Sequence, residues 1–156
     1  MKKHIPNCIT LLNLLCGSCA CILAMWQQYF PAFLFILAAA AFDFLDGFSA
    51  RLLKAYSEIG KQLDSLSDLV SFGLAPSLML FNWYLNSGAE YTAFAYCALL
   101  IVLFAALRLA RFNTDSRQSV DFIGLPVPAC AMIAAPLAGY GQICSVRGTD
   151  SAVISL

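Results

Sequence analysis

Residues 43–51 read Asp43-Phe44-Leu45-Asp46-Gly47-Phe48-Ser49-Ala50-Arg51, and Gly60, Asp64 and Asp68 follow them. The pattern is D-x2-D-G-x2-A-R-x8-G-x3-D-x3-D, set between long apolar segments. Ionised carboxylates beside apolar spans are costly unless they are paired with cations or bound to metal. The stretch therefore indicates a functional site.

The spacing of the aspartates indicates what kind of site this is. Asp43 and Asp46 are three positions apart, and Asp64 and Asp68 are four apart, so each pair lies on one face of a predicted helix. Two such helices together form an all-oxygen cage. Such a cage suits Mg²⁺ or Mn²⁺, and also Ca²⁺, and it is unsuited to zinc or copper. A buried ion-pair network is the alternative, but few basic residues lie near enough in sequence to neutralise four carboxylates.

The composition predicts a membrane protein. Hydrophobic residues make up 61% of the 156 residues and charged residues only 12%, whereas a soluble domain of this size needs a more charged surface. We expect an all-α, polytopic transmembrane helix bundle, with one domain over residues 1–145 and a short tail over 146–156. The net charge of zero gives no electrostatic case for a nucleic-acid partner.

Five apolar segments are each near the ~20 residues that cross a bilayer, at roughly 8–25, 30–50, 62–85, 91–110 and 126–143. With these spans, eight of the nine basic residues fall on one side, which should be the cytoplasmic side. The N-terminus and the aspartates are then expected on that side. The eight are Lys2, Lys3, Arg51, Lys54, Lys61, Arg108, Arg111 and Arg117, and only Arg147 lies opposite.

The residue types in the motif suit a displacement reaction at phosphorus. Four carboxylates can hold two divalent ions, which can bridge a diphosphate and neutralise the charge on a leaving phosphate. A carboxylate less committed to metal can accept a proton from an attacking hydroxyl. Gly47, Ala50 and Gly60 leave space for a nucleotide against the helices, and Arg51 can fork onto phosphate oxygens.

The full motif resembles that of the CDP-alcohol phosphatidyltransferase family, and every specified position matches. The resemblance implies a six-helix membrane enzyme, usually a homodimer, that transfers a phosphatidyl group from a CDP-linked lipid to an alcohol and releases CMP. It implies that Asp43, Asp46, Asp64 and Asp68 bind two metal ions and that Asp68 is also the base. The residues it places around the CDP moiety within the motif are Asp46, Gly47, Ala50, Arg51, Gly60 and Asp64.

Other stretches are similar to the serine-using branch, the CDP-diacylglycerol–serine O-phosphatidyltransferases, and cover residues from about 4 to about 140. That branch implies CDP-diacylglycerol and L-serine as substrates, phosphatidylserine and CMP as products, and a prokaryotic cytoplasmic membrane. Asn7 and Thr10 would lie near the nucleotide. Asn13, Arg108 and Arg111 would lie near a lipid phosphate or the serine carboxylate, although the two arginines fit a role as cytoplasmic-side anchors equally well. The matching stretches begin at Ile5-Pro6-Asn7, Asp64-Ser65-Leu66-Ser67-Asp68, Arg108-Leu109-Ala110-Arg111 and Phe122-Ile123-Gly124.

Three alternatives stay open. The same chemistry could use another alcohol, such as glycerol 3-phosphate or inositol phosphate, but a phosphorylated acceptor needs more basic residues than this chain offers near the motif. A cation pathway could use intramembrane carboxylates, but these cluster at one interface. Because residues 142–156 are too short and polar to span, the chain is also expected to lack the family's sixth helix, and an inactive remnant is the third alternative.

Overall fold

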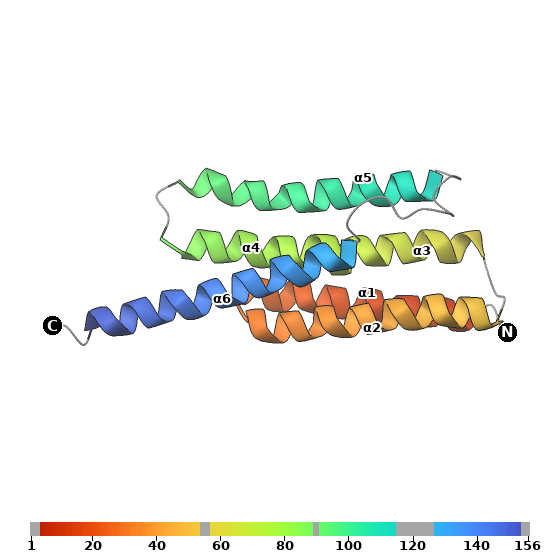
Figure 1. Cartoon of the computed structure of the whole chain (residues 1–156), viewed down its shortest axis with the longest axis horizontal. Coiled ribbons are helices and arrows are strands. Elements are labelled where there is room, and N and C mark those ends of the chain that lie inside the picture. Colours follow the sequence, from red (N-terminus) through yellow and green to blue (C-terminus); the bar gives the residue numbers. More distant parts are fainter. Residues whose placement is uncertain (1–3, 54–56, 89–90, 115–126, 154–156) are drawn as a thin grey trace.

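The computed structural model describes the chain except residues 1–3, 54–56, 89–90, 115–126 and 154–156, with side chains described from Pro6 to Tyr140 within these limits. All regular elements in the described residues are helical, as the sequence predicts, and Figure 1 shows them as a bundle. In chain order they are α1 (His4–Met25), α2 (Tyr29–Leu53), α3 (Glu58–Asp68), η1 (Leu69–Leu74), α4 (Ala75–Asn86), η2 (Thr92–Leu99), α5 (Leu100–Thr114) and α6 (Val127–Val153).

The five apolar segments of the sequence coincide with five helical stretches. Three helices in the described residues are long and apolar enough to cross a membrane: Pro6–Met25, Tyr29–Leu53 and Thr92–Thr114. The stretch from α3 to α4 is continuous but divided by η1, and the described apolar part of α6 covers Val127–Tyr140. The chain is therefore an integral membrane helix bundle, while five crossings stay a prediction.

Helices α1 and α2 form a tight antiparallel hairpin. The turn contains Gln27 at φ 60°, with Gln28 N donating to Leu23 O and Gln27 N donating to Ala24 O. This pair of hydrogen bonds is the Schellman arrangement that ends many helices. Alanines at 0% exposure, among them Ala20 and Ala32, line the bundle core, and small residues of this kind allow close helix packing in membranes.

A π-helical segment, η1, begins directly after Asp68. Ala75 N donates to Val70 O, five residues back, and buried Pro76 follows at the start of α4. Proline has no N–H to donate to the carbonyl four residues earlier, and a register change is one way in which a continuous helix accommodates it. Such π turns recur at functional sites.

The chain direction brings four helix ends to one end of the bundle. Figure 1 shows the start of α1, the end of α2, the start of α3 and the end of α5 together near the N-terminus. Helix α6 begins midway along the bundle and extends beyond the other helices at the opposite end. The predicted orientation depends in part on residues whose side chains the structure does not describe: Lys2, Lys3, Lys54, Arg117 and Arg147. The side chains of the predicted tail over 146–156 are also outside the described ones. Both the orientation and the tail therefore stay predictions.

Candidate metal and nucleotide site

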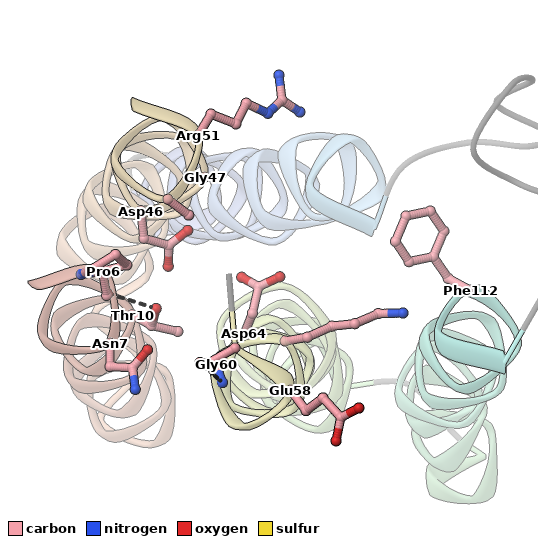
Figure 2. Close-up of a pocket in the computed structure, with 13 residues that line it drawn as sticks. Pro6, Asn7, Thr10, Asp46, Gly47, Arg51, Glu58, Gly60, Asp64 and Phe112 are labelled. Carbon is pink, nitrogen blue, oxygen red and sulfur yellow. Dashed lines mark hydrogen bonds between the residues drawn. The ribbon is translucent and has the colours of Figure 1, made fainter. Parts of the chain in front are cut away.

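The start of α3 is fixed by an N-cap. Ser57 is extended, at φ −139° and ψ 146°, and its Oγ accepts a hydrogen bond from Gly60 N at 3.0 Å. Serine at this position satisfies one of the free N–H groups of the first helical turn. The cap places Gly60 and, one turn later, Asp64 on the side of α3 that faces α1 and α2 (Figure 2).

The aspartates of α2 and α3 converge. Asp43, Asp64 and Asp68 offer carboxylate oxygens that all lie within 4.8 Å of one another. Asp46 is only 5% exposed, and its Oδ2 has no hydrogen-bond partner; neither does the buried Oδ1 of Asp64. Like charges at this spacing repel unless a cation lies between them, and unpartnered buried acceptors are costly.

Of the basic side chains that the structure describes, Arg51 and Lys61 are the nearest in sequence to the aspartates, and they do not fill that role. Lys61 Nζ donates to the main-chain O of Asn113 at 3.2 Å, and Arg51 is exposed and extends away from Asp46 in Figure 2. The oxygen donor set therefore fits hard divalent cations such as Mg²⁺, Mn²⁺ or Ca²⁺. Asp43, Asp46, Asp64 and Asp68 would hold them.

A pocket of about 580 Å³ opens beside these carboxylates. Asp46 from α2 and Asp64 from α3 point into the same space in Figure 2, with α1 forming a third wall. Eight residues that the sequence predicts to surround CDP line this one pocket: Asn7, Thr10, Asp46, Gly47, Ala50, Arg51, Gly60 and Asp64. Its volume is in the range of small-molecule sites.

Two of the four aspartates lie outside the pocket lining. Asp43 and Asp68 join the carboxylate cluster without lining the pocket, and Asp68 Oδ1 accepts a hydrogen bond from Asn13 Nδ2 at 3.3 Å. Asn13 is fully buried and does not line the pocket, and its predicted place near a lipid phosphate or the serine carboxylate stays a prediction. Thr10 Oγ1 donates to Pro6 O at 3.0 Å, which fixes its side chain at the pocket wall.

The structure does not bring the two candidate arginines of α5 into the pocket. Arg108 is half-buried and Arg111 is exposed, and neither lines the cavity. Phe112, the next residue along α5, does line it. Four other lining residues had no predicted role in the site: Pro6, Ser57, Glu58 and Lys61. Ser57, three positions before Gly60, is a recognisable capping signal in the sequence.

The end of α5 is tied to α3 by Asn113. Its Nδ2 donates to Ser65 Oγ at 2.8 Å, and its main-chain O accepts from Lys61. Both partners lie on α3, where Ser65 follows Asp64 and Lys61 follows Gly60. Sequence spacing cannot indicate these contacts, because 48 and 52 residues separate the partners. Only a residue-by-residue resemblance to a known family could have indicated them.

Comparison of the sequence with known proteins places the chain in a family. A model described as CDP-alcohol phosphatidyltransferase matches residues 3–152. The chain is 38% identical over 133 residues to the CDP-diacylglycerol–serine O-phosphatidyltransferase of Bacillus subtilis, covering 83% of this chain and 72% of that protein. The enzymes of that name from Methanocaldococcus jannaschii and Helicobacter pylori are 38% and 37% identical, over 89% and 82% of this chain but only 61% and 54% of theirs. The chain belongs to the CDP-alcohol phosphatidyltransferase family.

Proposed function

We propose that this protein transfers the phosphatidyl group of CDP-diacylglycerol to the hydroxyl of L-serine, which yields phosphatidylserine and CMP. The observation that carries the proposal is the meeting of two features at one end of the bundle. These are the carboxylate cluster of Asp43, Asp64 and Asp68, and a pocket lined by small residues and one arginine. The names of the relatives support serine as the acceptor.

Different pocket side chains can contact different parts of the CDP moiety. Gly47 and Gly60 present little bulk, so a nucleotide can lie against α2 and α3. Arg51 can swing back from its exposed position and fork onto phosphate oxygens. Asn7 and Thr10 offer polar contacts from α1. The exposed apolar side chains Phe44 and Phe48 flank this end of α2, where the acyl chains of the lipid can pack.

Asp68 is the proposed base. It takes the proton of the serine hydroxyl as the serine oxygen forms its bond to the phosphatidyl phosphorus and the bond from that phosphorus to the CMP oxygen breaks. When bound, two divalent cations would supply the positive charge that balances the diphosphate and the departing CMP. Asp43, Asp46 and Asp64 would hold these ions, with Asp68 shared between metal and proton transfer.

The charge near the site favours a zwitterionic acceptor. Among the described residues, Arg51 and Lys61 are the basic ones that line the pocket, and Arg51 is already assigned to the diphosphate. Glycerol 3-phosphate or inositol phosphate would bring further negative charge to a cavity that already contains carboxylates.

We further propose a homodimer in a prokaryotic cytoplasmic membrane, with this site on the cytoplasmic side. Arg51 at the end of α2 and Arg111 at the end of α5 lie at the same end of the bundle as the site, and they support that orientation.

An acceptor panel tests the proposal. The full chain, in vesicles containing CDP-diacylglycerol and Mn²⁺, is offered L-serine, glycerol 3-phosphate or inositol phosphate in turn, and CMP release is measured. We expect release with L-serine alone and a loss of at least about 100-fold in Asp68→Asn, which is the lower end of the range for removing an acid–base group. Release driven by a phosphorylated alcohol, and not by serine, would refute the acceptor assignment.

A further inference from the structure

The Asp68 carboxylate is connected to a buried polar relay that lies outside the pocket. Ser71 Oγ, on η1, is 2.7 Å from Asn13 Oδ1, and Asn13 Nδ2 is 3.3 Å from Asp68 Oδ1. Ser71 and Asn13 are both 0% exposed. Asn13 comes from α1, whereas Ser71 and Asp68 are three residues apart on the α3–η1 stretch, so the relay crosses a helix interface.

Hydrogen-bond chemistry sets the direction of the relay. Ser71 Oγ also lies 3.2 Å from the main-chain O of Asn13, but a hydroxyl has one proton to donate. An oxygen–oxygen separation of 2.7 Å requires a proton between the two atoms, so the hydroxyl donates to Asn13 Oδ1. The Asn13 amide is then oriented with its NH₂ group toward Asp68. The opposite orientation would set the amide oxygen against a carboxylate.

From this geometry we infer that Asn13 is a positioning residue, held by Ser71, that fixes the Asp68 carboxylate in the cation-binding cluster. The inference rests on the proposed function for its kinetic consequence only. With Oδ1 engaged by Asn13, the other Asp68 oxygen is left for the cations and the serine hydroxyl. Partners of this kind, which orient a ligand without touching the metal, typically account for 10–100-fold in metal affinity or activity.

The same interface provides a matched control. Ser67 is also 0% exposed, lies one turn before Ser71, and donates its Oγ to the main-chain O of Thr10 on α1 at 3.2 Å. Ser67→Ala and Ser71→Ala each remove one buried hydroxyl that bridges α1 to the α3–η1 stretch. Only Ser71→Ala frees the amide of Asn13. A role in folding alone predicts the same behaviour for both variants.

The test measures Mn²⁺ affinity, from the electron paramagnetic resonance signal of free Mn²⁺, and kcat and KM for serine-dependent CMP release. We expect Ser71→Ala to lower Mn²⁺ affinity and kcat by about 10-fold each, with the KM for CDP-diacylglycerol nearly unchanged, and Ser67→Ala to stay near wild type. Asn13→Leu, which keeps the side-chain size but removes the donor, should lose at least as much as Ser71→Ala.

The outcomes separate this inference from the proposed function. If Ser71→Ala and Ser67→Ala behave alike in Mn²⁺ affinity, or if Asn13→Leu binds Mn²⁺ as the wild type does, the inference is overturned. It is also overturned if the wild-type protein binds no Mn²⁺. If Mn²⁺ affinity falls in Ser71→Ala alone, while the wild-type protein releases no CMP with serine, the positioning role stands and the proposed function fails.

Discussion

Gly17 of α1 packs directly against the main chain of Ser71 in η1. A methyl group at Gly17 would lie 2.7 Å from Ser71 Cα and would also overlap the Ser71 hydroxyl. Backbone atoms cannot move aside as the end of a flexible side chain can, so Gly17→Ala must separate the two helices. We predict that Gly17→Ala lowers the free energy of unfolding by about 1–3 kcal/mol, as overpacking does.

Gly139→Ala is the matched control for this substitution. Gly139 lies in α6, and a methyl group there would meet nothing within 4 Å. Thermal unfolding of the purified protein in detergent should show a lower midpoint for Gly17→Ala only. Equal midpoints for the two variants would mean that α1 and η1 do not pack as described.

Gly47 has the opposite environment. A methyl group at Gly47 would meet no atom within 4 Å, and the residue lines the pocket. Gly47→Ala should therefore leave the unfolding midpoint unchanged but raise the KM for CDP-diacylglycerol, by roughly 10-fold for one methyl group in a fitted site. Steady-state kinetics at several lipid concentrations check this. An unchanged KM would place the nucleotide away from Gly47.

The N-cap of α3 is expected to matter for stability and for the site together. Ser57→Ala removes the acceptor for Gly60 N and should cost about 1 kcal/mol. Ser57→Thr keeps an acceptor oxygen and should restore most of that loss, which thermal unfolding measures. If Ser57→Ala and Ser57→Thr unfold alike, the hydrogen bond from Gly60 N is not what fixes the start of α3.

Divalent cations should stabilise the protein through the carboxylate cluster. Excess Mn²⁺ should raise the unfolding midpoint, since at 100 times its Kd a ligand adds about 2.7 kcal/mol. In the presence of a chelator, Asp64→Asn should be more stable than wild type, because it removes one of several like charges. With Mn²⁺ present, the wild-type protein should be more stable than Asp64→Asn.

Glu58→Gln serves as the charge-matched control for Asp64→Asn. Glu58 is an exposed carboxylate at the pocket lining and is not in the cluster. The unfolding midpoint of Glu58→Gln should rise with Mn²⁺ as that of the wild type does. A loss of the Mn²⁺ response in Glu58→Gln, with retention in Asp64→Asn, would contradict the assignment of cation-binding residues.

The sequence predicts the helical membrane class well, because apolar segment length and charge are properties of short stretches. The i, i+3 and i, i+4 spacings likewise place each aspartate pair on one helix face without any tertiary information. The relay from Ser71 through Asn13 to Asp68 could not be predicted, because 55 and 58 residues separate the hydrogen-bonded partners. The same holds for Asn113, whose partners are fixed only when α5 packs on α3.

The π segment after Asp68 also lies beyond sequence reasoning. Residues 62–85 read as one uninterrupted apolar span, whereas the structure changes helical register between Leu69 and Leu74. Pro76 was the visible signal, but proline alone predicts a kink and not the manner in which the backbone relieves it. The register change sets which residues face α1, and with them the buried contacts behind Asp68.

The most direct test of the central claim is the incorporation of isotope-labelled L-serine into lipid by the full chain in vesicles that contain CDP-diacylglycerol and Mn²⁺. The account predicts labelled phosphatidylserine formed in equal amount to the CMP released, dependent on Mn²⁺ and abolished in Asp68→Asn. CMP released without label in lipid, or label incorporated equally by Asp68→Asn, would contradict it.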